Sequence, residues 1–136
     1  MYLTSFHHVA LICSNYERSK HFYTEVLGFQ IVQETYRAAR QSYKLDLALP
    51  LETSENLTCA YRLELFSFPD PPPRPSRPEA CGLRHLAFTT PDLDSVVAHL
   101  QAQGIAVEPI RVDELTEKRF TFVQDPDGLP LELYEA

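Results

Sequence analysis

Two short motifs occur twice in this chain, in the same order, and this internal repeat constrains the fold more than any other feature. The motif His8-Val-Ala-Leu11 returns as His85-Leu-Ala-Phe88, and Leu63-Glu-Leu-Phe66 returns as Leu131-Glu-Leu-Tyr134. A single match of four residues would be weak evidence for a repeat. Two matches in the same order, each holding a His or a Glu, indicate that the chain consists of two tandem copies of one module.

A proline-rich stretch separates the two copies. Six of the eleven prolines in the chain fall between Pro69 and Pro78. Proline lacks the amide donor and fixes φ, so this stretch cannot continue a helix or lie in a central strand, and it is predicted to be a semi-rigid connector. We therefore expect a single domain, residues 1–136, made of a first module at about 1–68, a connector at 69–82 and a second module at about 83–136.

Each module is predicted to contain a strand that starts with its His, then one helix, then three strands. Ser14 and Glu17 form a capping box at the start of the first helix, which extends to about Leu27. Asp92 can cap the second helix, whose apolar residues recur at helical spacing from Leu93 onward. The expected later strands lie at about 29–35, 43–49 and 59–67 in the first module and at about 105–111, 118–124 and 130–135 in the second. The fold class is therefore α+β, with two tandem βαβββ modules.

Composition limits the partners and the compartment. With 44% hydrophobic residues, a chain of 136 residues can form a core without disulfides. The net charge of −7 argues against a general binder of nucleic acids or anionic membranes, and no apolar run approaches the roughly 20 residues that span a bilayer. Cys13, Cys59 and Cys81 form no disulfide or zinc pattern, and the start of the sequence lacks the features of a signal peptide. We therefore expect a cytoplasmic protein with reduced thiols and without a nucleic-acid or membrane partner.

The repeated His and Glu residues are the candidates for chemistry. Residues two apart on a strand share a face, so Glu64 and Glu132 each lie between leucines that point to the opposite face. A carboxylate in an apolar strand is costly to bury unless it is paired, protonated or bound to a metal. The simplest explanation is that the two carboxylates and the two repeated histidines converge on one divalent cation. The candidate ligands are His8, Glu64, His85 and Glu132.

Such a ligand set is compatible with Zn²⁺, Ni²⁺, Co²⁺ and Mn²⁺, and it leaves a position for water or substrate, as catalytic metal sites do. His7 and His8 are adjacent, and only one of two neighbours on a strand can face such a site. The repeat pairs His8 with His85, so we expect His8 to be the ligand and His7 to be a surface or packing residue.

Three features together resemble one known superfamily. They are the ordered His–Glu–His–Glu set, the run Phe22-Tyr-Thr-Glu-Val-Leu-Gly-Phe29 and the turn Asp125-Pro-Asp-Gly128. The combination resembles the vicinal oxygen chelate superfamily, which includes glyoxalase I, extradiol dioxygenases, fosfomycin-resistance enzymes and bleomycin-resistance proteins. It is closest to small bacterial proteins described as lactoylglutathione-lyase-like. The resemblance implies paired βαβββ modules that form a U-shaped mixed sheet around a metal site, and a homodimer in which ligands from two chains can complete each site.

Within that superfamily, the set of four ligands is similar to that of glyoxalase I. The resemblance implies a metalloenzyme that isomerises a thiol–aldehyde hemithioacetal through a metal-stabilised enediolate, with Zn²⁺ or Ni²⁺ favoured. It implies that Glu132 is the base that takes the C1 proton, with Glu64 the candidate on the opposite side. Two alternatives stay open: another metal-dependent reaction, such as extradiol dioxygenation or fosfomycin-type thiol transfer, and non-catalytic binding of a small molecule, as in bleomycin-resistance proteins.

The substrate contacts of glyoxalase I are not reproduced in this sequence. The positions where those enzymes carry an Arg and an Asn that hold glutathione correspond here to Ile12 and Phe68. Other cations can hold a carboxylate or phosphate of a substrate, and the sequence does not distinguish among them. They are Arg37, Lys44, Arg74, Arg77, Lys118 and Arg119.

Overall fold

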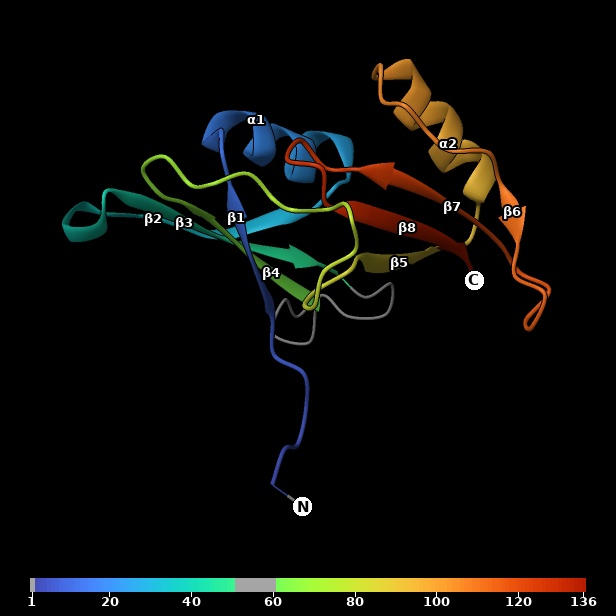
Figure 1. Cartoon of the computed structure of the whole chain (residues 1–136), viewed down its shortest axis with the longest axis horizontal. Helices are drawn as coiled ribbons and strands as arrows, with labels where there is room; N and C mark the ends of the chain where they lie inside the picture. The colour runs from blue at the N-terminus through green and yellow to red at the C-terminus, as the bar shows by residue number, and fades with distance from the viewer. Residues whose placement is uncertain (1, 51–60) are drawn as a thin grey trace. The chain divides into compact units, whose positions relative to one another are not determined.

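The chain folds into two compact units, Met1–Pro72 and Pro73–Ala136, and each contains a four-stranded sheet. The computed structural model describes residues 2–50 and 61–136 (Figure 1). The boundary between the units falls in the proline-rich stretch, which forms neither helix nor strand, because proline removes the backbone donors that both require.

The first unit begins with a strand and a helix and continues with three strands. Its elements are β1 (Val9–Cys13), α1 (Tyr16–His21), η1 (Phe22–Val26), β2 (Gln30–Arg37), η2 (Ala38–Arg40), β3 (Ser42–Leu49) and β4 (Tyr61–Ser67). The turn η1 is π-helical, since the amide of Leu27 donates to the carbonyl of Phe22, five residues back (3.0 Å). The sheet order is β1-β4-β3-β2, with β1 parallel to β4 and the other neighbours antiparallel.

The second unit repeats this topology. Its elements are β5 (Leu86–Thr90), α2 (Leu93–Ala102), β6 (Arg111–Val112), β7 (Arg119–Gln124) and β8 (Pro130–Glu135). The sheet order is β5-β8-β7-β6, with β5 parallel to β8 and the other neighbours antiparallel. The predicted α+β class with two tandem modules is thus confirmed.

The register of the parallel strands is the same in both units. Ala10 of β1 is the partner of Glu64 in β4, and Ala87 of β5 is the partner of Glu132 in β8. Each Glu therefore lies on an inner strand, and each predicted His ligand lies two residues before the partner of its Glu. Because residues two apart on an extended chain share a face, this register brings each His to the same side of the sheet as its Glu.

Leucines on the opposite face of each sheet belong to the hydrophobic core of its unit. In β4, Leu63 and Leu65 keep only 5% and 2% of their exposure. The corresponding leucines of β8, Leu131 and Leu133, keep 0% and 5%. Burial of one such side chain stabilises the fold by about 1.5–3 kcal/mol. Apolar burial on one face thus determines which face presents the carboxylates.

Two local predictions are wrong. The N-cap of α1 is Asn15 rather than Ser14, and its side chain accepts a hydrogen bond from an amide of the first turn (3.0 Å). Asn and Ser cap helices about equally well, so a shift of one residue satisfies a free amide equally. The strand expected at 105–111 is reduced to Arg111–Val112. Pro109 lies within the expected strand and has no amide hydrogen to continue a ladder.

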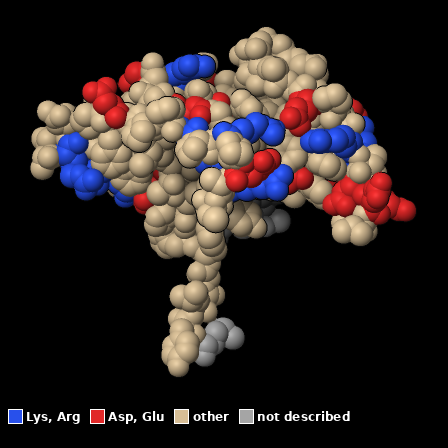
Figure 2. All heavy atoms as spheres, viewed as in Figure 1, with Lys and Arg blue, Asp and Glu red and all other residues tan. Residues whose placement is uncertain are grey.

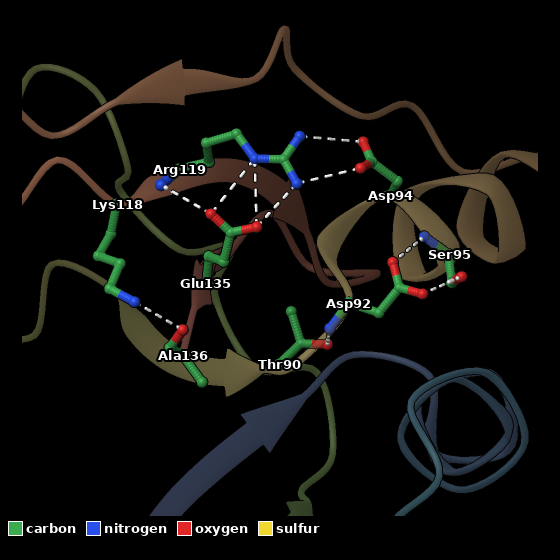
Figure 3. Close-up of polar contacts among 8 residues, drawn as sticks. All are labelled: Thr90, Asp92, Asp94, Ser95, Lys118, Arg119, Glu135 and Ala136. Carbon is green, nitrogen blue, oxygen red and sulfur yellow. Dashed lines mark hydrogen bonds and ion pairs between the residues drawn. The ribbon is translucent and has the colours of Figure 1, made fainter.

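A polar network attaches α2 to the sheet of its own unit (Figure 3). Arg119 of β7 donates to Asp94 in the first turn of α2 (3.0 Å) and to Glu135 of β8 (2.7 Å). The hydrogen bonds from Arg119 hold the pKa of the Glu135 carboxyl below its usual range. Asp92 caps α2, as predicted, by accepting a hydrogen bond from an amide of the first turn (3.0 Å). Local capping and one arginine thus add to the packing of Leu93 and Leu100, the fully buried residues of α2.

The two cysteines that the structure describes lie in different units. Cys13 is buried at the end of β1 and Cys81 is exposed, whereas Cys59, predicted to lie in a strand, is outside the described residues. Acidic and basic side chains are interspersed over the face drawn in Figure 2. No helix in the described part of the chain has the length and apolar content needed to cross a membrane.

Candidate metal centre

In the first unit, the predicted ligands His8 and Glu64 lie next to each other. The distance from His8 Nε2 to Glu64 Oε2 is 3.2 Å. The two side chains keep 36% and 17% of their exposure. The pair is therefore accessible from one side, as a site for a metal ion or a substrate must be.

The second unit places His85 and Glu132 in the same way. The distance from His85 Nε2 to Glu132 Oε2 is again 3.2 Å, and the side chains keep 31% and 18% of their exposure. Phe122, the partner of Glu132 in β7, meets the His85 ring edge-to-face, with centroids 5.2 Å apart. The equal distances follow from the equal register of the two sheets.

The donor atoms of each pair fit a divalent metal ion. Imidazole nitrogen and carboxylate oxygen bind Zn²⁺ at about 2.0–2.2 Å, so two donors on one ion lie roughly 3.0–3.4 Å apart at the usual ligand angles. Both observed distances of 3.2 Å lie in that interval. Within the described part of each unit, no third His, Cys, Asp or Glu joins its pair as a possible ligand. The convergence of both pairs on one ion stays a prediction.

A lysine connects the first pair to a further carboxylate. Lys44 Nζ lies 3.2 Å from Glu64 Oε1 and 3.3 Å from Asp46 Oδ1. Burial lowers the pKa of Lys44, but the hydrogen bonds to Glu64 and Asp46 outweigh burial, so the net effect raises its pKa. The ammonium therefore stays charged and lies between the carboxylates of Glu64 and Asp46.

Sequence reasoning did not assign a role to Asp46, and Lys44 was only one of several open cations. The signal that could have found them is their spacing, since residues two apart on a strand share a face. What was missing is the pairing of β3 with β4, in which Asp46 is the direct partner of Glu64.

His7 contacts the other nitrogen of the His8 ring. The Nδ1 atoms of the two rings are 2.8 Å apart, while His8 Nε2 faces Glu64. Metal-binding histidines commonly use their second ring nitrogen in a hydrogen bond that fixes the ring. His7 is exposed, as expected for a surface residue, but its contact with His8 was not predicted from the sequence, because adjacent residues on a strand are expected to point to opposite faces.

The second unit also contains a cleft next to its pair. Its volume is about 1020 Å³, and its walls include His85 and Phe122. Several cationic side chains line it as well, with Arg84 and Arg111 among them. Glu79 and Glu108 line it too and pair with Arg77 and Arg111, so the cleft combines a candidate metal ligand, an aromatic surface and charges of both signs.

Six Lys and Arg side chains were candidates for binding a substrate anion. Four of them bind other partners within their own unit, and among the described residues none of these four forms a hydrogen bond or ion pair with a candidate metal ligand. They are Arg74 (carbonyls of Leu83 and Arg84), Arg77 (Glu79), Lys118 (carbonyl of Ala136) and Arg119 (Asp94 and Glu135). Lys44 contacts the candidate ligand Glu64, and Arg37 contacts Ser42 and aromatic rings.

Two tandem modules, each with a His–Glu pair in the same register, define a duplicated α+β fold with candidate metal ligands in both copies. Residues 5–133 match the model of the Glyoxalase/Bleomycin resistance protein/Dioxygenase superfamily. The chain therefore belongs to this superfamily, the vicinal oxygen chelate group, as the sequence resemblance predicted. Its members typically bind a metal ion and small molecules, many are enzymes, and dimers are common.

Particular relatives share nearly the whole chain. The chain is 62% identical over 135 residues to the uncharacterized protein YwkD of Bacillus subtilis (strain 168), covering 99% of each. It is 57% identical over 133 residues to the uncharacterized protein YaeR of Escherichia coli (strain K12), covering 98% of this chain and 97% of that protein. The solved structure of a glyoxalase family protein from Enterococcus faecalis is 47% identical, covers 99% of this chain and 100% of its own, and superposes with a TM-score of 0.85.

Proposed function

We propose that this protein is a metal-dependent lyase of the glyoxalase I type, which isomerises a hemithioacetal formed from a thiol and an aldehyde. The observation that supports it best is that both modules keep a His and a Glu 3.2 Å apart, so all four predicted ligands are present in matching places. We further propose that the enzyme acts in the cytoplasm as a homodimer, with its ligands drawn from one chain or from two.

The residues proposed to hold the ion are His8, Glu64, His85 and Glu132. When bound, a divalent ion supplies Lewis-acid polarisation of the substrate oxygens and stabilises the negative charge that develops on them. Two carboxylates with two neutral imidazoles balance the charge of such an ion. The remaining proposals concern what the side chains of this chain do.

Glu132 is the side chain proposed to move the proton. Its Oε2 faces His85, and its Oε1 has no hydrogen bond or ion pair within the described residues, whereas His8 and Lys44 lie next to the two oxygens of Glu64. An oxygen without a partner can accept the C1 proton of the hemithioacetal and return it to the neighbouring carbon, which leaves a hydroxy thioester. Glu64, held by Lys44, then serves as a ligand rather than as the base.

The thiol component is proposed to differ from glutathione. In place of the Arg and Asn that hold glutathione in glyoxalase I, this chain has Ile12, which is exposed on β1, and Phe68. Phe68 stacks on Phe66, with ring centroids 6.1 Å apart. An aromatic surface in this place does not supply the polar contacts of an amide, so it favours a different thiol.

The test combines metal analysis with an isomerase assay. Purified protein is stripped of metal, reconstituted separately with Zn²⁺, Ni²⁺, Co²⁺ and Mn²⁺, and assayed with hemithioacetals of methylglyoxal and several small thiols, glutathione included. We expect turnover only in metal-loaded protein. We expect Glu132→Gln to lower kcat by about 10²–10⁴-fold, the usual contribution of a general base. Glu114→Gln, an exposed carboxylate in the same unit, is the matched control and should retain activity.

Three results would reject the proposal. One is retained activity in Glu132→Gln, which would remove the base. Another is turnover that does not depend on metal. The third is a protein that binds iron and consumes oxygen with catechols but isomerises no hemithioacetal, which would establish dioxygenase chemistry instead.

A further inference from the structure

Arg37 differs from the other cations of the chain in what surrounds its guanidinium. Its Nη2 donates to Ser42 Oγ (3.0 Å), and its central carbon lies 4.9 Å from the centroid of the Phe66 ring and 5.9 Å from that of Phe68. Its Nε is buried and has no hydrogen-bond partner in the part of the chain that the structure describes. No described carboxylate lies within ion-pair distance of it, so both a donor and a positive charge are unused.

The second unit provides a contrasting arginine. Arg111 lies over the rings of Phe120 and Phe122, at 5.1 and 5.6 Å from their centroids. Its Nη2, however, lies 2.9 Å from Glu108 Oε2, so its charge is neutralised within the chain. Both arginines therefore lie over two aromatic rings. Arg111 has a carboxylate partner, whereas Arg37 has none among the described residues.

Arg37 belongs to the same sheet face as the first His–Glu pair. Arg37 of β2 is the partner of Ser42 in β3. Two residues further along β3, Lys44 is the partner of Phe66 in β4. Glu64 precedes Phe66 by two residues on the same strand. Partners across strands and residues two apart along a strand share a face. Two residues of a strand span roughly 7 Å, so the aromatic surface begins about 7 Å from the carboxylate of the pair.

We propose that Arg37, stacked on Phe66 and Phe68 and oriented by Ser42, binds the carboxylate of a substrate whose reacting oxygens lie at the His8–Glu64 pair. This inference rests on the proposed function for the role of that pair. The free Nε–H and the Nη groups offer the planar donor edge that matches a carboxylate. Arg40, whose guanidinium lies 5.2 Å from the Phe68 ring, adds positive charge.

The spacing defines the class of substrate. The aromatic surface begins about 7 Å from the carboxylate of the pair and Arg37 lies over it, so the anionic end is at least about 7 Å from the reacting end. This separation suits an adduct with a compact apolar or aromatic body and a terminal carboxylate. Phe66 is half-buried, so it can pack against such a body while one side stays accessible. A neutral amide of the same shape offers only one acceptor oxygen and no charge, so it would lose the bidentate, charge-assisted contact and would bind more weakly.

A binding experiment tests Arg37 without requiring turnover. Binding of 3-phenylpropanoate and of its neutral analogue 3-phenylpropanamide to the full-length, zinc-reconstituted protein is measured by calorimetry. We expect the carboxylate to bind at least tenfold more tightly than the amide. Arg37→Gln should abolish this preference, and Arg37→Lys, which keeps the charge but not the planar edge, should keep part of it. Arg18→Gln removes an exposed arginine of the same unit and should change neither affinity more than twofold.

A kinetic experiment tests the same residue during turnover. Hemithioacetals of phenylglyoxal are formed with 3-mercaptopropionate, which carries a carboxylate, and with neutral 2-mercaptoethanol. We expect Arg37→Gln to raise KM at least tenfold for the carboxylated adduct, with kcat and the kinetics of the neutral adduct unchanged.

The two experiments separate the two proposals. An equal affinity of wild-type protein for acid and amide, or a preference that survives Arg37→Gln in folded protein, overturns the carboxylate site. Absence of turnover with every hemithioacetal overturns the proposed function, while the binding data still decide the role of Arg37. Circular dichroism of each variant shows whether it is folded, and Arg37→Lys keeps the test decisive if Arg37→Gln does not fold.

Discussion

The two His–Glu pairs have the same backbone register but different surroundings. In the first unit, the neighbours of Glu64 on β3 are charged: Asp46 is its direct partner, and Lys44 binds one of its oxygens. In the second unit, the direct partner of Glu132 on β7 is Phe122, and among the described residues its carboxylate forms an ion pair with His85 alone. One carboxylate is therefore fixed among charges, and the other lies beside an aromatic ring.

This difference shows how a duplicated module can acquire two roles. Backbone register depends on strand pairing and on the buried leucines, which both copies retain, so both His–Glu pairs keep the same geometry. On β3 the residues that alternate with the site-facing ones, Leu45 and Leu47, are fully buried, so burial constrains the core face and leaves the site-facing side chains free to differ between the two copies. We propose that this divergence makes Glu64 an anchored ligand and leaves Glu132 able to carry a proton.

The largest effect should distinguish the two glutamates. Glu132→Gln removes the proposed base, so kcat should fall by about 10²–10⁴-fold. Glu64→Gln removes a charged ligand, so metal affinity should fall at least about tenfold, and saturating metal should restore part of the activity. Metal titrations followed by kcat measurements at saturating metal check this split. If both variants lose the same fraction of kcat at saturating metal, the two carboxylates do not have separate roles.

A smaller effect should come from the charge that only the first unit carries. Lys44→Gln leaves the directly opposed carboxylates of Glu64 and Asp46 without a cation, so the metal-free protein should lose about 1 kcal/mol of unfolding free energy. A bound dication supplies the missing charge, so Zn²⁺ should stabilise this variant more than it stabilises the wild type. Urea denaturation with and without Zn²⁺ measures both quantities, and Lys118→Gln is the control. An equal response of variant and wild type to Zn²⁺ would contradict this account of Lys44.

An effect of similar size concerns the two helix caps. Asn15→Ala should destabilise the protein by about 1 kcal/mol, because a backbone amide loses its acceptor, and this loss should not depend on pH. Asp92 accepts hydrogen bonds from the hydroxyl and the amide of Ser95, and these lower its pKa below the usual value of about 3.9. Its stabilisation is therefore complete above that value and is lost as the pH falls through the lower pKa of the folded state.

The measurement for the caps is the unfolding free energy of both alanine variants between pH 6 and pH 2. The difference between wild type and Asp92→Ala should shrink at the acidic end, whereas that between wild type and Asn15→Ala should stay constant. A constant difference for Asp92→Ala would mean that its charge contributes nothing to the cap.

The repeat, the fold class and the adjacency within each His–Glu pair could be predicted because they depend on local patterns. Side chains alternate along a strand, so Glu64 must lie on the face opposite to that of Leu63 and Leu65. Because the motif is repeated, the same prediction holds for Glu132. The errors were also local: Asn15 replaced Ser14 as a cap of equal quality, and Pro109 shortened a strand whose apolar pattern was otherwise adequate.

The neighbours of the pairs were decided by the tertiary structure alone. Lys44 meets Glu64, and Arg37 meets Phe66, only because β2, β3 and β4 align in one register, and strands far apart in sequence acquire that register through the burial of their opposite face. The sequence by itself determined which residues repeat and which side of a strand they occupy. Folding decided which charges and rings surround them, since cross-strand contacts depend on pairing and not on sequence spacing.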